Sequence, residues 1–309
     1  MLKYVNVELS EKLNIYLAVM NHFKITKNSF HIRLKGYALL ILLTCSLTAG
    51  AQEITAKGIL TDENAIPLPW VNIGIKKKNI GSMSKANGKF ELQIPSTSFQ
   101  DTLLFSYVGY HDQAIPISAF QTGNENKIIL KKSTHQLQEV VITNRKKKIR
   151  KLGTTGYTPM VWVSISFKNK NDFAEQAQLI KISEPTRLLE VRAKVAGNKK
   201  KTDSVNYRLN IYAVKDGLPG PRILEKNLIK SFSMAEREIS FDLTRESIFT
   251  DKDCIVSFEY IPKGNTEHID ILSFRASITG KGGYSRKASI GDWTPMSAGS
   301  GSIYAIVEQ

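Results

Sequence analysis

Residues 57–94 hold the feature that most constrains the fold, a turn signal followed by regular alternation. Three apolar residues alternate with charged or polar residues over 89–94, which predicts a strand with one buried face and one wet face. Asn87 and Gly88 precede this strand, and both residue types tolerate the positive φ that a type I′ turn needs at its two central positions. We therefore expect Asn87-Gly88 to be the tip of a β-hairpin joining residues 82–84 to 89–94.

The segments around this hairpin extend the all-β pattern. Pro67 and Pro69 exclude a helix before an expected strand at 70–75. Short runs with strand character, separated by polar turns, follow at 103–108, 111–117, 127–131 and 137–143. We expect a seven-stranded β-sandwich.

Several of these residues together resemble the carboxypeptidase regulatory-like domain, a transthyretin-like or Ig-like sandwich of bacteria that have an outer membrane. The matching positions are Gly58, Leu60, Asp62, Pro67, Leu68, Val71, Ile73, Asn87 to Phe90, Leu104 to Tyr110, Leu130 and Leu137 to Ile142. Domains of this family accompany carboxypeptidases without containing their zinc site. The resemblance therefore implies a fold and carries over no catalytic residue.

The first 51 residues have the pattern of a secretory signal peptide. An apolar run at 37–47 follows Arg33 and Lys35 and precedes small residues of the kind that a signal peptidase reads. The run is too short to cross a bilayer as a helix. We expect a mature chain that begins at Gln52, has no transmembrane span, and resides in the periplasm or at the outer membrane and cell surface.

Two alternatives at this end of the chain stay open. Met20 is a second possible start, and Cys45 is a possible lipidation site in place of cleavage after Ala51. The other cysteine is Cys254. A mature chain with one cysteine has no intramolecular disulfide, so its hydrophobic cores have to hold it together.

The formal net charge of +15 is concentrated in a few runs. These runs are 76–78, 145–151 and 199–201. Such runs are solvated loops or a footprint for an anionic envelope surface such as lipid head groups. No aromatic residues interleave with them to stack bases, so we expect no nucleic-acid partner.

The longest basic run also predicts the domain organisation. We expect a signal peptide at 1–51, the first sandwich at 52–143, a basic linker at 144–156 and a second sandwich at 157–309. Alternating runs around 189–195, 205–211, 239–243 and 254–260 predict half-buried antiparallel strands for this second domain. We expect eight or nine strands in a jelly-roll-like sandwich, which also resembles an uncharacterised β-sandwich that often follows the regulatory-like domain.

The search for catalytic and metal-binding patterns gives little. His111, His135 and His268 each stand alone, and none belongs to a zinc or nucleophile motif. Asp251 and Asp253 flank a turn but lack the spaced oxygen ligands of a calcium loop. We expect no metal, no cofactor and no enzymatic activity.

One candidate ligand site remains. Two aromatic residues, each followed closely by Thr-Pro-Met, lie near the two ends of the second domain's sequence, and the first and last strands of a domain are often neighbours. The candidate site residues are Tyr157, Trp162, Trp293, Tyr284 and Arg286, with Lys281 as a further polar companion. The alternative is that the tryptophans are core residues that close the sandwich.

These observations predict an exported, non-enzymatic binding or adaptor protein of the cell envelope. The ending at 139–142 resembles the junction at which TonB-dependent receptors pass from the regulatory-like domain to a plug, so a role assisting outer-membrane transport is expected. The expected partner is an envelope protein or a glycan. The alternatives are a carbohydrate-binding protein of the cell surface and, third, a hydrolase accessory domain.

Overall fold

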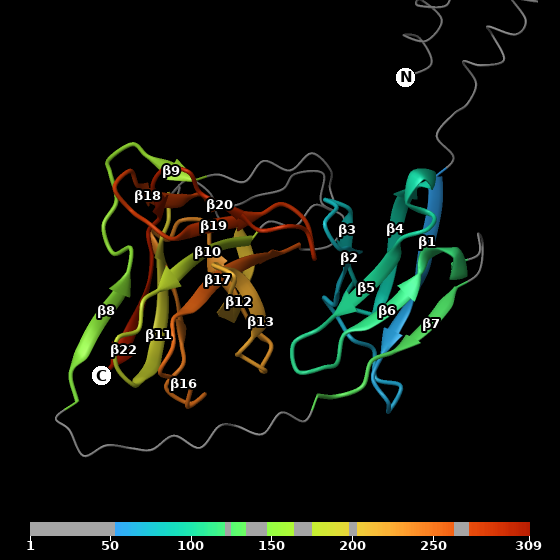
Figure 1. The fold of residues 1–309 in the computed structure, drawn as a ribbon, viewed down its shortest axis with the longest axis horizontal. Helices are drawn as coiled ribbons and strands as arrows, with labels where there is room; N and C mark the ends of the chain where they lie inside the picture. Colours follow the sequence, from blue (N-terminus) through green and yellow to red (C-terminus); the bar gives the residue numbers. More distant parts are fainter. Residues whose placement is uncertain (1–52, 121–124, 134–146, 164–174, 198–202, 263–271) are drawn as a thin grey trace, which may run out of the picture. The chain divides into compact units, whose positions relative to one another are not determined.

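The computed structural model describes residues 53–120, 125–133, 147–163, 175–197, 203–262 and 272–309. Within these residues the chain consists of β-strands and two short 3₁₀-helices, η1 (Ser96–Ser98) and η2 (Ile117–Ala119), with no α-helix, so the all-β prediction is confirmed (Figure 1). None of this part of the chain forms a helix that is long and apolar enough to cross a membrane. The expected signal peptide at 1–51 and the strand expected at 137–143 lie outside the described residues.

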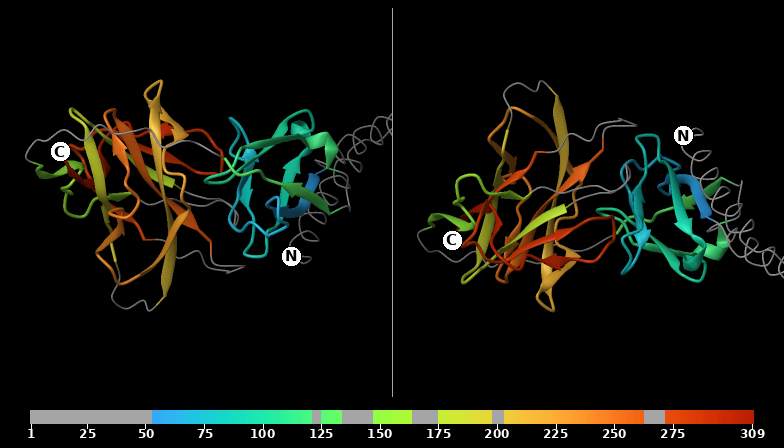
Figure 2. Two further views of the ribbon diagram at one scale, coloured as in Figure 1. Left: turned by 90° about the horizontal axis from the view of Figure 1, so that it is seen from below. Right: turned by 90° about the horizontal axis from the view of Figure 1, so that it is seen from above.

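The first module, residues 53–133, contains seven described strands in two sheets (Figures 1 and 2). One sheet has the order β4-β1-β7 and the other β3-β2-β5-β6. β1 pairs antiparallel with β4 and parallel with β7. The strands are β1 (Glu53–Thr61), β2 (Asn72–Ile75), β3 (Gly81–Met83), β4 (Lys89–Pro95), β5 (Thr102–Ser106), β6 (Gln113–Pro116) and β7 (Asn126–Ile129).

The core of the first module follows the alternation of its strands. Along β4, Phe90, Leu92 and Ile94 are buried while the residues between them are exposed, as the sequence predicts. Phe90 packs edge-on against Phe105 with ring centroids 5.4 Å apart, and Phe120 completes this aromatic cluster. Aromatic side chains bury large areas, so this cluster contributes to the module's stability.

The turn at Asn87-Gly88 differs from the prediction. Gly88 has φ of +77°, but Asn87 does not have a positive φ, so the turn is not type I′. The Gly88 amide donates to the Lys85 carbonyl at 2.9 Å and the Lys85 amide donates to the Lys89 carbonyl at 2.8 Å. This is a three-residue connection with glycine in the left-handed position. Strands β3 and β4 belong to different sheets, so a tight two-residue hairpin does not join them.

The second module, residues 147–309, contains the remaining strands. They lie in sheets of order β13-β12-β17-β10-β19-β20, with β14 beside β12, of order β15-β11-β22-β8, with β16 beside β11, and of order β21-β18-β9. The strands are β8 (Ile149–Gly153), β9 (Trp162–Val163), β10 (Glu175–Ile180), β11 (Thr186–Lys194), β12 (Ser204–Lys215), β13 (Leu218–Arg222), β14 (Leu228–Ser233), β15 (Glu238–Asp242), β16 (Phe249–Thr250), β17 (Cys254–Ile261), β18 (Phe274–Ser277), β19 (Gly283–Arg286), β20 (Thr294–Pro295), β21 (Ser300–Gly301) and β22 (Ile303–Glu308).

A single hydrophobic core joins the two large sheets of this module. β11 and β22 contribute Val191 and Ala305, whereas β12 and β17 contribute Leu209 and Phe258 from the facing sheet. The Tyr207 ring lies in the same core, and its hydroxyl donates to the Leu272 carbonyl at 3.1 Å. Because every second residue of β12 and β17 points into this core, the residues between them point out of the opposite face of the sheet.

Part of the expected basic linker at 144–156 is a strand. Residues 149–153 form β8, which pairs antiparallel with β22 near the end of the chain (Figure 1). β8 lies at the edge of its sheet, so its side chains do not need to be apolar. Arg150 and Lys151 are exposed there. The sequence does not predict this strand, because its basic residues do not alternate with apolar ones.

The modules contact one another through apolar side chains and through backbone. Met83 and Trp70 of the first module pack with Ile261 and Ile229 of the second. Residues 53–309 accordingly form one compact unit. The Ser289 carbonyl of the second module lies so close to the β2–β3 pair that a Cβ added to Gly74 would come within 2.3 Å of it.

Candidate functional site

A row of four charged residues crosses the face of the second module's large sheet that points away from its core. Arg208 on β12 pairs in register with Glu259 on β17, which pairs with Glu175 on β10, which pairs with Arg286 on β19. The two carboxylates are therefore neighbours, with an arginine on each side. All four residues are buried. Ion pairs that are removed from water need excellent geometry and many hydrogen bonds to be stable.

Arg208 connects this row to the first module. Its Nη1 donates to Glu259 Oε2 at 3.2 Å and to Asn72 Oδ1 at 3.1 Å. Its Nη2 donates to the Trp70 carbonyl, and its Nε donates to Asn227 Oδ1 at 2.9 Å. Asn72 also donates to Glu259 Oε1 at 2.8 Å. One amide of the first module thus contacts both members of a buried ion pair in the second.

The remaining polar groups donate hydrogen bonds to the two carboxylates. Asn210 Nδ2 donates to Glu175 Oε1 at 2.9 Å and to Glu259 Oε2 at 2.8 Å. Tyr212 and Ser257 donate their hydroxyl hydrogens to Glu175 Oε1. Arg286 Nε donates to Glu175 Oε2 at 2.6 Å. Both oxygens of each carboxylate thus accept hydrogen bonds, which hold the two side chains in place.

Burial and neighbouring charges also shift the pKa values of Glu259 in the row and of Tyr212 beside it. Burial by itself would raise the pKa of Glu259, but Arg208, Arg286, Arg222 and the Asn210 amide outweigh it and lower the pKa to about 2. Burial and the nearby Glu175 raise the pKa of the Tyr212 hydroxyl far above its usual value. At neutral pH Glu259 is therefore ionised, and Tyr212 is a neutral hydrogen-bond donor.

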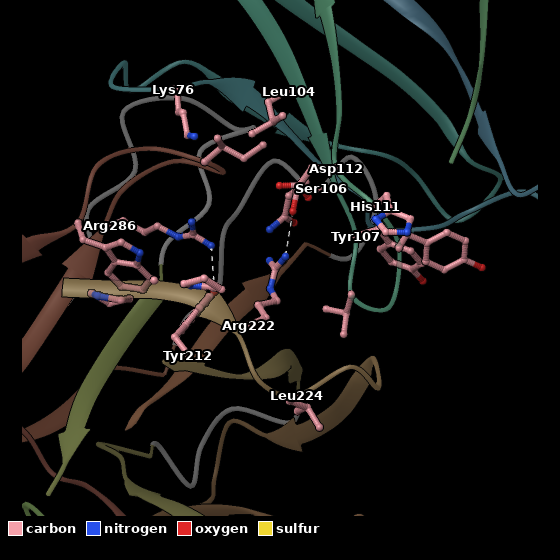
Figure 3. A pocket seen from close by; sticks show the side chains of 18 of the residues that line it. Lys76, Leu104, Ser106, Tyr107, His111, Asp112, Tyr212, Arg222, Leu224 and Arg286 are labelled. Carbon is pink, nitrogen blue, oxygen red and sulfur yellow. Dashed lines mark hydrogen bonds between the residues drawn. The ribbon is translucent and has the colours of Figure 1, made fainter. Parts of the chain in front are cut away.

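A cavity of about 720 Å³ lies beside this row, and both modules line it (Figure 3). The second module contributes Tyr212, Arg222, Arg286 and Trp293, and the first module contributes segments around Lys76 and 104–112. This volume is in the range of small-molecule sites, which combine apolar and aromatic walls with a few polar groups.

The structure brings together three of the five candidate site residues. Trp293 packs edge-on against Tyr212 at 5.7 Å, and the Arg286 guanidinium lies 4.8 Å from the Trp293 ring centroid. Tyr284 lies on the same strand as Arg286, is buried, and donates its hydroxyl hydrogen to the Gly217 carbonyl at 2.9 Å.

The other two candidate residues lie in different surroundings, beside β18. Trp162 is on β9, which pairs with β18, and its side chain is 53% exposed. Tyr157 is flanked by Arg275 and Lys194, whose charged ends lie 5.2 Å and 5.4 Å from its ring centroid. The last strand, β22, pairs with β8, which lies in the expected linker, and the contacts of Tyr157 and Trp293 belong to separate groups.

The sequence offers three histidines and two aspartates as possible metal ligands. His135 and His268 lie outside the described residues, whereas His111 lines the cavity. Asp253 accepts a hydrogen bond from the Ile182 amide at 2.7 Å. In the described part of the chain, no three side chains of histidine, cysteine, aspartate or glutamate converge in a way that could hold a metal ion.

Sequence reasoning missed Glu175, Glu259, Arg208 and Arg222. The alternation along β12 and β17 indicates which residues point away from the core, but it predicts that these residues face solvent. The available signal was a charged residue at the same register position on neighbouring strands, and that signal appears only once the strand pairing is known.

Comparison with known proteins identifies the first module. The family model of the CarboxypepD_reg-like domain matches residues 56–142. Residues 56–142 form a CarboxypepD_reg-like domain. The resemblance to the carboxypeptidase regulatory-like domain is thus confirmed, and the described strands of the first module lie largely within the matched residues.

Similar sequences occur in larger proteins. The TonB-dependent receptor SusC of Bacteroides thetaiotaomicron is 34% identical over 97 residues, which are 31% of this chain and 9% of the receptor. The TonB-dependent receptor P3 of Formosa agariphila is 30% identical over 118 residues, which are 38% of this chain and 11% of the receptor. The chain thus spans about a tenth of the length of these relatives.

Solved structures add little. The structure of the infectious bursal disease virus Gx strain covers 83% of this chain, and this chain covers 63% of it, at 10% identity and a TM-score of 0.28. A TM-score this low does not bear on the fold or function of this chain.

Proposed function

We propose that this protein is an exported, non-enzymatic binding or adaptor protein of the cell envelope that assists outer-membrane transport. The observation that carries the proposal is the CarboxypepD_reg-like domain at 56–142, which is similar to segments of TonB-dependent receptors. In this proposal the first module is a transthyretin-like or Ig-like sandwich and the second a jelly-roll-like sandwich. The protein acts in the periplasm or at the outer membrane and cell surface.

The chemistry of the charged row favours binding over catalysis. Its carboxylates accept hydrogen bonds from arginine, amide and hydroxyl groups, and its arginines donate to them, which fixes side chains in place. Asn72 and Arg208 also form a hydrogen bond at 3.1 Å, so the charged row takes part in the contact between the two modules. The proposed partner is an envelope protein, with the basic surface contacting anionic groups of the envelope.

The test is a crosslinking experiment in the native host. The chain carries a C-terminal affinity tag, cells are crosslinked, and complexes are purified from periplasmic and outer-membrane fractions. We expect a TonB-dependent receptor to copurify with the tagged chain, and N-terminal sequencing to place Gln52 at the start of the mature form. A matched control lacks residues 2–51 and should yield no receptor complex.

Two results would contradict this proposal. The tagged chain could fractionate with the cytoplasm with an intact Met1, which would exclude export. It could instead reach the envelope and crosslink to no receptor while receptor-dependent uptake is unchanged in a deletion strain, which would exclude the transport role.

A second candidate function, carbohydrate binding, is favoured by one specific observation. Trp293 and Arg286 lie together in the wall of the cavity, where an aromatic ring and a guanidinium are suited to a sugar ring and its hydroxyls. Binding of soluble oligosaccharides to the purified protein, measured by isothermal titration calorimetry, tests this candidate. An absence of binding across neutral and acidic sugars would remove it.

A further inference from the structure

The wall of the cavity between the modules contains an arginine, Arg222, that forms no ion pair with a described carboxylate. Arg208 and Arg286 are each paired with a carboxylate, at 3.2 Å and 2.5 Å. Arg222, by contrast, has no carboxylate within ion-pair distance among the described residues. Its Nη1 donates to the Ser106 hydroxyl at 3.0 Å, and its Nε is buried without a hydrogen-bond partner. Arg222 is half-buried, and its unpaired Nε leaves it able to bind an anion that enters the cavity.

The surroundings of Arg222 keep it charged and point it at the cavity. Burial by itself would lower its pKa, but Tyr212 and the carboxylates of Glu259 and Glu175 outweigh this effect and the pKa is raised. The guanidinium lies 5.8 Å from the Tyr212 ring centroid and reaches toward Ser106 across the cavity (Figure 3). An entering anion would therefore meet a half-buried guanidinium that is held by the Ser106 hydroxyl.

The other residues of the wall limit what kind of anion fits. Asp112, Glu225 and Asp292 also line the cavity, so a ligand with several negative charges would be repelled. The aromatic rings of Trp293 and Tyr212 offer apolar surface beside the arginine. A ligand with one carboxylate and a ring with a hydrophobic face satisfies both conditions, because a carboxylate matches the planar fork of a guanidinium.

We propose that this cavity binds an acidic sugar of the hexuronate type, with Arg222 contacting its carboxylate and the Trp293 region contacting its ring. The inference deepens the carbohydrate-binding candidate and rests on it for the ring, whereas the anion contact rests on Arg222 alone. Lys76 enters the cavity wall from the first module, so the ligand would touch both modules. Its binding would therefore also stabilise their contact.

The test measures binding of three probes to the mature chain by titration calorimetry and ligand-observed NMR. The probes are glucuronate, glucose as its neutral counterpart, and inorganic phosphate. We expect glucuronate to bind at least about tenfold more tightly than glucose or phosphate, and Arg222→Gln to remove this preference. Arg245→Gln changes an exposed arginine of the β15–β16 connection and should leave binding unchanged.

Two further measurements keep the result decisive. Thermal unfolding establishes that Arg222→Gln is folded, and Lys76→Glu offers a second variant at an exposed position that should weaken glucuronate binding by charge reversal.

Binding of glucuronate that is unaffected by Arg222→Gln would overturn the proposal, as would absence of glucuronate binding. Equal binding of glucose would overturn the anion contact but leave the carbohydrate-binding candidate standing. Equal, Arg222-dependent binding of phosphate would overturn the sugar assignment. None of these outcomes bears on receptor copurification, which tests the adaptor role separately.

Discussion

Arg208 Nη1 and Glu259 Oε2 lie 3.2 Å apart on directly opposed residues of β12 and β17, and both side chains are excluded from solvent. Asn72 of the first module contacts both. The pair is thus covered by another module of the same chain. Its geometry leads to the first prediction, because a buried ion pair is most sensitive to the loss of one partner.

Arg208→Met should lower the free energy of unfolding by about 3–5 kcal/mol, because it leaves Glu259 and Glu175 buried next to one another with one arginine fewer. Urea unfolding at neutral pH measures this loss. The matched control is Lys89→Met, which removes one partner of an ion pair with Glu125 in which both side chains are 54% exposed. That control should change stability by less than about 1 kcal/mol. Equal effects of the two variants would contradict the burial of the row.

The second prediction concerns pH. Glu259 has a folded-state pKa of about 2, lowered from the 4.5 of a free glutamate. A carboxyl whose pKa is depressed on folding contributes stability that is fully present above its unfolded value and disappears as pH falls through its folded value. We expect the free energy of unfolding to fall between about pH 4.5 and pH 2.

The control for this pH dependence is Glu259→Gln. The variant is less stable at neutral pH but should lose less stability than the parent between those pH values, because the titrating group is absent. Urea unfolding of both proteins at a series of pH values gives the two slopes. Parallel slopes would show that Glu259 has the same pKa in the folded and unfolded chain.

The extent to which the sequence predicts this molecule depends on how local each signal is. Alternation in β4, β12 and β17 predicts which residues enter the cores, because the two-residue period of a strand is a property of the strand alone. The burial of Arg208 and Asn210 could not be predicted in the same way. These residues alternate with core residues, which typically indicates a solvent-exposed face. They are buried because the first module covers this face of the sheet, a contact that the sequence pattern of the strand does not contain.

Turn chemistry shows a second limit on what the sequence predicts. Both Asn87-Gly88 and Asp216-Gly217 have the composition of a type I′ turn, but only Asp216 and Gly217 both adopt positive φ, at 51° and 75°. Those two residues connect strands β12 and β13, which pair directly through Lys215 and Leu218. At Asn87-Gly88 the flanking strands lie in different sheets. The dipeptide therefore indicates a turn, but the pairing of the strands decides its type.

The candidate site was predictable only in part. Trp293, Tyr284 and Arg286 lie close together in sequence, so one turn and one strand bring them near each other. The prediction that Tyr157 and Trp162 share this patch depends on the domain's first and last strands being neighbours. The strand that pairs with β22 is β8, which precedes the expected start of the domain, and Trp162 instead lies on β9, which pairs with β18.

The third prediction concerns Gly88. A Cβ at this position would lie 2.6 Å from the Leu60 carbonyl oxygen, and the backbone has φ of +77°. Gly88→Val should therefore lower the free energy of unfolding by at least about 1–3 kcal/mol, the usual cost of a strained backbone conformation. Asn87→Ala is the control, since it removes only the acceptor for the Lys89 amide at 3.1 Å and should cost less than about 1 kcal/mol. A valine variant with an unchanged melting curve would exclude this turn geometry.

The last prediction compares the two tryptophans of the candidate site. Trp293 is half-buried between Tyr212 and Arg286, whereas Trp162 is 53% exposed. Complete burial of a tryptophan makes its replacement by alanine cost about 3–5 kcal/mol, so a half-buried ring should cost about 2 kcal/mol and an exposed one less than about 1 kcal/mol.

Urea unfolding of Trp293→Ala and Trp162→Ala measures this difference directly. Trp293→Ala also removes the ring that covers the Arg286 guanidinium, so glucuronate binding should weaken together with stability. Trp162→Ala should leave that binding unchanged, because Trp162 pairs through β9 with β18 and does not line the cavity. If Trp162→Ala abolished sugar binding while Trp293→Ala preserved it, the ligand surface would lie at β9 and β18, and the cavity would have to be given up as the site.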